Sequence, residues 1–281
     1  MDALAVSEAG TPGRPAIVFL HGSGTTARMW TRHLPSFHDY HGFAPDLPGH
    51  GDSGQLPWRS LADAAERVAE LIRTRAVGRQ ANVVGLSLGG EVGYVLLARY
   101  PDLVRRAVID GAAVVPSRVA PLLKLGVAVV SPFVHYRPVM RALARMVGVP
   151  LAELGSFESE LRRVRTRTFR RAFADAQDPG VLTDVLRSTV PTLLVTGERE
   201  LVDMHMANAA LGAHRPHTTA RVVPAVGHGW LASKPDLHAR MVRAWIEDQA
   251  LPAELQPETD AWRTTRPGRR IEQAAEHLGL A

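Results

Sequence analysis

Cysteine is absent from the 281 residues of this chain. This absence excludes disulfides, a thiolate nucleophile and cysteine-ligated metals, and it is compatible with a reducing compartment. Long hydrophobic runs are absent too: the longest, residues 122–134, contains Lys124 and Pro132 and is too short to span a bilayer. Residues 1–10 lack the basic and apolar segments of a signal peptide. We therefore expect a cytoplasmic protein with no stable membrane insertion.

Charge is nearly balanced, with 33 Lys and Arg against 28 Asp and Glu. Residues 114–190 hold a local excess, 12 basic against 6 acidic, and six arginines crowd one expected helix: Arg162, Arg163, Arg165, Arg167, Arg170 and Arg171. We interpret most of them as a solvated face with Glu158 and Glu160 as helical ion-pair partners. The alternative is a rim that attracts an acidic substrate. Without interleaved aromatic residues or a recognised motif, no nucleic-acid partner is expected.

Short apolar runs alternate with stretches of helical periodicity over much of the chain. Strands are expected at 16–20, 43–46, 82–86, 104–109, 191–197 and 220–224, and helices at 28–37, 61–76, 88–100, 204–212 and 235–249. Such alternation predicts an α/β fold with a doubly wound, mostly parallel sheet. In such sheets the ligand lies outside the carboxyl ends of the strands.

The alternation stops between residues 114 and 190. Helices are expected there at 118–130, 139–147, 157–176 and 179–187, broken by prolines, which predicts an inserted helical cap. The core then comprises residues 1–113 and 191–250. Residues 251–281 are polar and punctuated by proline, and we expect a tail that lies on the surface or is partly disordered.

The segment from Asn82 to Glu91 predicts a nucleophile. A valine-rich strand runs into Gly85-x-Ser87-x-Gly89, and helical spacing follows at once. This strand–turn–helix context is that of a nucleophile elbow, whose serine projects above the sheet from a strained turn. The alternative is a glycine-rich turn with a serine that caps the helix.

A second glycine-rich loop, His21-Gly22-Ser23-Gly24, follows the expected strand at 16–20. Such a loop can direct a backbone N–H towards the serine. The N–H groups of Ser23 and Leu88 are the candidates for an oxyanion hole, in which each donor contributes about 3 kcal/mol. Taken alone, the loop could equally be a tight turn with a packed histidine.

A serine nucleophile needs a base and an acid that orients the base. His228 lies between two glycines in the loop after the last expected strand of the core, and it is the candidate base. Glu200, in the loop after Gly197, is the first candidate for the acid. Asp110, at a strand end, and Asp203 remain second and third. The residues not used as the acid would be surface carboxylates or helix caps.

Four motifs in order carry a resemblance: His21-Gly-Ser-Gly, the segment from Asp46 to Ser53, Gly85-Leu-Ser-Leu-Gly-Gly and Gly227-His228. Over residues 4–250 the chain resembles the α/β-hydrolase superfamily, and the helical segment resembles that family's cap domain. The Gly-Leu-Ser-Leu-Gly-Gly form is similar to that of enol-lactonases and small-ester hydrolases. One departure is Glu200, where the family usually has aspartate. Since Ser87 stands where epoxide- and halide-displacing members have aspartate, those reactions are excluded.

The sequence therefore predicts a serine hydrolase that cleaves an ester, lactone or related acyl bond of a small, largely apolar substrate, with no metal or cofactor. Candidates for an apolar pocket, which could equally be core or cap packing, are Met29, Trp30, Phe133, Met140, Trp230 and Leu231. The main alternative is a lyase, cyclase or C–C bond hydrolase that uses the same site. A ligand-binding protein and a lipase with residues 122–134 as its lid are further alternatives. Homo-oligomerisation is left open.

Overall fold

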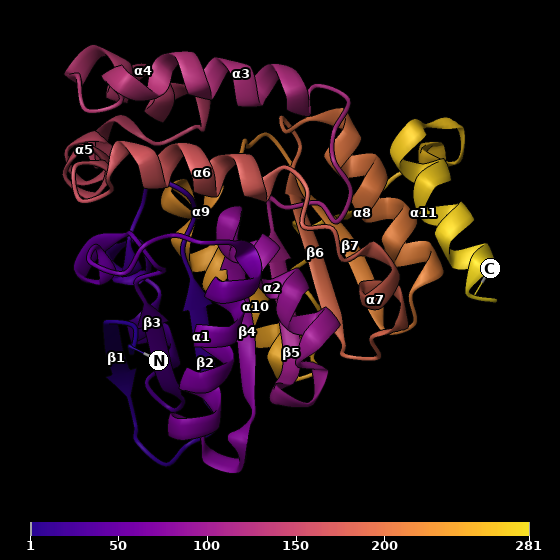
Figure 1. The fold of residues 1–281 in the computed structure, drawn as a ribbon. Coiled ribbons are helices and arrows are strands. Elements are labelled where there is room, and N and C mark those ends of the chain that lie inside the picture. Colours follow the sequence, from indigo (N-terminus) through magenta and orange to yellow (C-terminus); the bar gives the residue numbers. More distant parts are fainter. Residues whose placement is uncertain (1, 281) are drawn as a thin grey trace.

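A single eight-stranded sheet forms the centre of the computed structural model, which describes residues 2–280, without the side chains of residues 260 and 264 (Figure 1). Its strand order is β1-β3-β2-β4-β5-β6-β7-β8. The six strands from β3 to β7 in this order are parallel, and β1 and β8 are antiparallel edges. The strands are β1 Val6–Gly10, β2 Ala16–Leu20, β3 His41–Pro45, β4 Ala81–Leu86, β5 Val104–Asp110, β6 Thr192–Gly197, β7 Thr218–Val223 and β8 Gln256–Pro257. The predicted doubly wound, mostly parallel sheet is confirmed.

The central strands are apolar throughout because helices cover both faces of the sheet. Alternate residues of β2 show this directly: Val18 belongs to the hydrophobic cluster on one face, and Phe19 to the cluster on the other. The first cluster is covered by α1 (Leu61–Arg75), α2 (Leu88–Arg99), α8 (Val202–His214) and α11 (Arg266–His277). The second is covered by α9 (Trp230–Ser233), α10 (Pro235–Ile246) and two short 3-10 helices.

Those two 3-10 helices, η1 (Ala27–Trp30) and η2 (Leu34–Phe37), replace the one helix expected at 28–37. Proline in the first turn of η2 removes a backbone donor, which accounts for the interruption. The remaining 3-10 helices are η3 Gly51–Ser53, η4 Val77–Arg79, η5 Pro101–Leu103, η6 Ser131–Phe133, η7 Leu151–Glu153 and η8 Asp260–Thr264.

The segment between β5 and β6, named here the helical insertion (residues 111–191), contains five α-helices and no strand, and it is described throughout. They are α3 Ala120–Val130, α4 Arg137–Met146, α5 Leu154–Leu161, α6 Thr166–Ala176 and α7 Leu182–Arg187. Figure 1 shows α5 and α6 above the carboxyl ends of the strands, with α3 and α4 outermost. A separate hydrophobic cluster that includes Met140, Leu161 and Phe169 holds these helices together.

The helix expected at 157–176 is two helices, because the chain turns at residues 162–165 between α5 and α6. The six arginines therefore do not share one helix: three lie in the turn and three on α6. The two glutamates that were expected to pair with these arginines have other partners. Glu158 pairs with Arg137 and Arg141 of α4, and Glu160 binds the backbone of the core.

Residues 251–280 pack against the core, a feature that the expectation of a tail lying on the surface or partly disordered did not include. Strand β8 pairs with β7, and α11 packs on α8 (Figure 1). Trp262 is 1% exposed, and its ring meets that of His214 at 5.1 Å. Glu258 binds the His205 ring at 2.9 Å. The segment completes the apolar cover of one sheet face.

Candidate active site

Ser87 occupies the sharp turn between β4 and α2, with φ +52° and ψ −118°. This conformation costs energy for a residue with a side chain, and here close packing holds it. A Cβ at Gly85 would lie 2.3 Å from the Gly89 carbonyl oxygen, and one at Gly89 would lie 2.2 Å from the Leu20 carbonyl oxygen. The Ser87 N–H donates to the Asp110 carbonyl at 2.8 Å. Only glycine therefore fits at positions 85 and 89, two residues before and two residues after this serine.

The loop that follows β2 lies against the serine. An added Cβ at Gly22 would touch the Ser87 Cβ at 3.6 Å. His21 is fully buried, and its Nε2 accepts a hydrogen bond from the Leu47 N–H at 2.9 Å. Burial lowers the pKa of His21 to about 4, against a smaller effect of its contact with the Gly22 carbonyl. A neutral histidine thus fastens this loop to the next one.

The N–H groups of Ser23 and Leu88 belong to the two segments that meet at Ser87. Leu88 is the first residue of α2, where the helix supplies no acceptor for its N–H. Ser23 lines the same cavity as Ser87. Among residues 2–280, neither the Ser23 nor the Leu88 N–H donates a hydrogen bond to another protein group. Both N–H groups therefore remain candidates for an oxyanion hole.

His228 and Glu200 are joined by a hydrogen bond between Nδ1 and Oε2 of 2.7 Å. The Glu200 side chain is 4% exposed, and its other oxygen accepts the Gly197 N–H at 2.9 Å. Burial alone would lower the pKa of His228, but the charge of Glu200 and the hydrogen bond to it outweigh this effect and raise the pKa. This contact fixes the proton on Nδ1 and leaves Nε2 to accept one.

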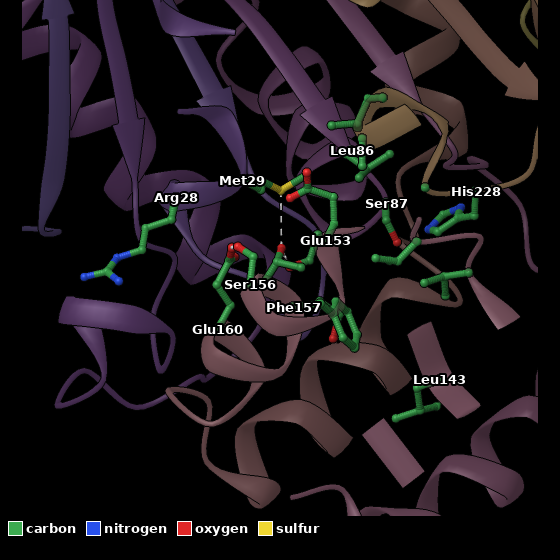
Figure 2. Close-up of a pocket in the computed structure, with 18 of the residues that line it drawn as sticks. Arg28, Met29, Leu86, Ser87, Leu143, Glu153, Ser156, Phe157, Glu160 and His228 are labelled. Atoms are coloured by element: carbon green, nitrogen blue, oxygen red, sulfur yellow. Dashed lines mark hydrogen bonds between the residues drawn. The ribbon is translucent and has the colours of Figure 1, made fainter. Parts of the chain in front are cut away.

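Ser87 and His228 line the same cavity, and Figure 2 shows their side chains next to each other at one end of it. The described residues contain no hydrogen bond between them. Catalytic contacts of this kind are often long in the free enzyme and tighten in the complex.

Gly111 is a site residue that the sequence analysis missed. Its φ is +58°, and a Cβ here would lie 2.8 Å from His228 Cε1 and Nδ1. The imidazole therefore occupies space that any side chain at position 111 would take. The available signal was a glycine directly after the strand end at Asp110.

Asp110 and Asp203, the two rival carboxylates, have other partners. Asp110 accepts a hydrogen bond from Trp230 Nε1 at 3.1 Å, and burial raises its pKa well above the usual range, with the charge of Glu200 adding to the effect. Asp203 accepts from Ser117 Oγ at 2.9 Å and from the Arg118 N–H at 2.7 Å. Partial burial opposes ionisation of Asp203, but these hydrogen bonds outweigh it and lower its pKa. Asp203 thus anchors the start of the helical insertion.

The cavity above Ser87 has a volume of about 600 Å³. Its walls from the helical insertion are mostly apolar: Val127, Leu143, Met146, Val147, Val149, Phe157, Phe169 and Phe173. Besides Ser87 and His228, its polar lining residues are Ser23, Thr25, Arg28, Thr31, Arg32, His33, Glu153, Ser156 and Glu160. In Figure 2, Ser156 and Glu160 lie together, and Arg28 points away from Ser87. The wall formed by the helical insertion is thus mostly apolar, with a polar corner at Ser156 and Glu160.

Two of the six predicted pocket residues, Met29 and Leu231, line this cavity. The other four do not. Trp30 and Trp230 are buried in the hydrophobic cluster on the sheet face that α9 and α10 cover, and Met140 is buried inside the helical insertion. Phe133 is 61% exposed on the outer surface of the insertion. Their apolar character serves packing or an outer face, so the pocket prediction is wrong at these positions.

Glu160 joins the helical insertion to the core at the polar corner. Its Oε2 accepts the Thr26 N–H at 2.9 Å, and Ser156 Oγ lies 3.3 Å from Oε1. Burial raises the pKa of this carboxyl, against the effect of the hydrogen bond from Thr26. Among residues 2–280, no group of three or more His, Asp and Glu side chains is placed to hold a metal ion.

Comparison with known proteins agrees with this geometry. A family model described as "Alpha/beta hydrolase family" matches residues 17–241. An "AB hydrolase superfamily protein" of Gibberella zeae is 27% identical over 86% of this chain and 83% of its own length. A "2-hydroxy-6-oxononadienedioate/2-hydroxy-6-oxononatrienedioate hydrolase" of Burkholderia vietnamiensis is 31% identical, but over 54% of this chain and 55% of that protein.

Among solved structures, the enol-lactonase of Burkholderia xenovorans superposes with a TM-score of 0.72 at 19% identity, over 87% of this chain and 96% of that one. At this identity the likeness concerns the fold. No helix within residues 2–280 combines the length and apolar character that a bilayer crossing requires. Sheet order, elbow geometry and the family match all agree, and the chain belongs to the alpha/beta hydrolase family.

Proposed function

We propose that the protein is a serine hydrolase that cleaves an ester, lactone or related acyl bond through an acyl-enzyme. The observation that carries this proposal is the 2.7 Å contact between His228 Nδ1 and Glu200 Oε2, with Ser87 in the same cavity. This contact leaves His228 Nε2 free of the proton, as a general base requires.

In the first step, Ser87 Oγ attacks the carbonyl carbon of the substrate while His228 Nε2 takes the serine proton. The imidazolium that forms is stabilised by Glu200, which is already hydrogen-bonded to the opposite ring nitrogen. The same proton then passes to the leaving alkoxide, which departs as an alcohol. Water attacks the acyl-enzyme with His228 again as base, and Ser87 is restored.

The negative charge that develops on the carbonyl oxygen is assigned to the N–H groups of Ser23 and Leu88. Both donors are held by backbone, in the loop after β2 and at the start of α2, so they need no rearrangement during the reaction. A preorganised donor of this kind contributes about 3 kcal/mol to transition-state stabilisation.

The substrate class follows from the walls of the cavity. Phe157, Phe169 and Leu143 present apolar surface, whereas Ser156 and Glu160 supply a polar corner. We assign to this site a small, largely apolar acyl or alcohol group with one hydrogen-bonding substituent. Its size is limited by the cavity volume of about 600 Å³.

A fluorophosphonate probe tests the proposal, because it labels a serine only where a base activates it. Wild-type protein is expected to be labelled at Ser87 and to hydrolyse short p-nitrophenyl esters, and Ser87→Ala abolishes both. Labelling of a folded Ser87→Ala variant would place the nucleophile elsewhere. A folded wild type that neither reacts with the probe nor turns over any acyl substrate would reject the proposal.

A second candidate is hydrolysis of a C–C bond beside a carbonyl group, which is favoured by the partial match to the Burkholderia vietnamiensis hydrolase. Arg28 at the cavity wall would suit a substrate carboxylate, whereas Arg32 already pairs with Glu153 at 2.8 Å. Inertness towards p-nitrophenyl esters, with turnover of a vinylogous 1,5-diketone acid, would favour this candidate over the first.

A further inference from the structure

The outermost helix of the insertion presents an apolar face that nothing in the described chain covers. Leu122, Leu125 and Val129 of α3 are 68%, 62% and 63% exposed. Phe133 and Tyr136 extend this surface into the turn before α4, at 61% and 65% exposed. We name these five residues the outer face. An apolar surface of this extent usually marks an interaction site in a monomer.

The charged residues of the segment that carries the outer face all have one sign. Residues 111–150 contain no Asp or Glu, and their five basic residues are Arg118, Lys124, Arg137, Arg141 and Arg145. Arg118, Arg137 and Arg141 are paired with carboxylates of other segments. Within residues 2–280, Lys124 and Arg145 form no ion pair. The exposed leucine, valine and aromatic side chains of the outer face therefore belong to a segment whose own charged residues are all basic.

The same helices reach the cavity mouth. Val127 of α3 and Leu143 of α4 line the cavity from the side opposite the outer face. Met146, at the end of α4, lines the cavity and is also 69% exposed. Apolar surface thus continues from outside the molecule to the space above Ser87.

We propose that the outer face adsorbs to an anionic lipid surface, with α3 lying in the plane of the interface. Amphipathic helices with apolar and Lys/Arg side chains bind membranes in this way, by apolar burial together with attraction to anionic headgroups. The charge pattern argues for this partner over a second copy of the chain, because two such faces would bring like charges together. Adsorption would hold the cavity mouth at Met146 beside the lipid.

Vesicle sedimentation tests the proposal without any measurement of activity. Wild-type protein is expected to sediment with vesicles of phosphatidylcholine mixed with phosphatidylglycerol, to bind pure phosphatidylcholine much less, and to be released by salt. Leu125→Glu removes an apolar contact and adds a repelled charge, so it should weaken binding by about tenfold or more. The matched control is Val77→Glu, since Val77 is 55% exposed and lies just before β4, at the opposite end of the sheet.

Charge is tested separately. Lys124→Gln should weaken binding to anionic vesicles by about fivefold, the contribution of one cation at such a surface. Arg187→Gln, an exposed position on α7 away from the outer face, makes the same change in net charge and should leave binding unchanged. Equal binding by wild type and Leu125→Glu, or equal loss in both charge variants, would overturn the proposal. So would a wild-type dimer that Leu125→Glu converts to monomer, because the outer face would then be a subunit interface.

Discussion

Glu200 Oε2 lies 2.7 Å from His228 Nδ1, whereas the carboxyl of Asp110, at the end of the neighbouring strand β5, accepts its hydrogen bond from Trp230. The two carboxyl groups therefore have different partners. Glu200 binds the His228 imidazole, whereas the carboxyl of Asp110 lies 3.8 Å from His238 Nε2. Asp110 is buried beside an indole, and its pKa is raised by that burial.

Glu200→Gln is expected to lower kcat by about 10³- to 10⁴-fold, because an amide no longer stabilises the imidazolium or fixes the ring tautomer. Asp110→Asn should lose less than about tenfold, since Asp110 is hydrogen-bonded to Trp230 and Glu200 is the carboxylate that binds the His228 ring. Steady-state kinetics with a p-nitrophenyl ester measures both, with thermal unfolding to confirm that each variant folds. The opposite ranking would make Asp110 the orienting acid.

The pH profile reports the His228–Glu200 pair. The base must be neutral, and the raised pKa of His228 means that kcat/KM falls as pH decreases through a value above 6.5. Glu200→Gln removes the charge that raises this pKa, so the acid limb should move to lower pH in its residual activity. For stability the sign is reversed: the pair stabilises the fold below the unfolded pKa of histidine, and this contribution is lost as pH rises through the raised value. An acid limb that is the same in both proteins would contradict this assignment.

Gly111→Ala should displace the imidazole, because the added Cβ would lie 2.8 Å from His228 Cε1 and Nδ1. We expect kcat to fall by about a hundredfold, the effect of a misplaced catalytic group. Gly78→Ala is the matched control: Gly78 has φ +68°, but an added Cβ would have no neighbour within 4 Å. Both variants carry the backbone cost of about 1–2 kcal/mol. Equal kinetic losses in the two variants would show that the clash with His228 has no effect on catalysis.

Trp262→Ala tests the role of the C-terminal segment in the core. Removing this buried indole should lower the free energy of unfolding by about 3–5 kcal/mol, measured by urea denaturation. The kcat of the folded variant should stay near that of wild type, because Trp262 lies in the cluster on the α8 and α11 side and does not line the cavity. Unchanged stability would mean that the segment contributes little to the fold.

The sheet and the elbow could be predicted because each depends on residues that are close together in the sequence. The apolar strands follow from burial on both faces, and Gly85 and Gly89 occupy positions at which a Cβ would meet backbone atoms. The order of the motifs along the chain then indicated the α/β-hydrolase superfamily.

The remaining features depend on contacts between distant segments. Trp30 and Trp230 were candidates for the pocket, but their depth depends on which side of the sheet each element covers. The burial of Trp262 depends on the packing of α11 onto α8. The polar composition of residues 251–281 gave no indication of this packing. Asp110 ends β5 and Glu200 follows the end of β6, and only the path of the loop that carries His228 decides which carboxyl binds its ring.

Strands β5 and β6 are direct neighbours, with Ala107 opposite Thr192. Two parallel neighbours need only one crossover helix between them, yet the chain makes an excursion of five helices there. The proposed catalytic groups Ser87, Glu200 and His228 all lie outside the helical insertion, whereas much of the cavity wall belongs to it. We expect that replacing the insertion would change which molecules fit the cavity and leave these three side chains in place.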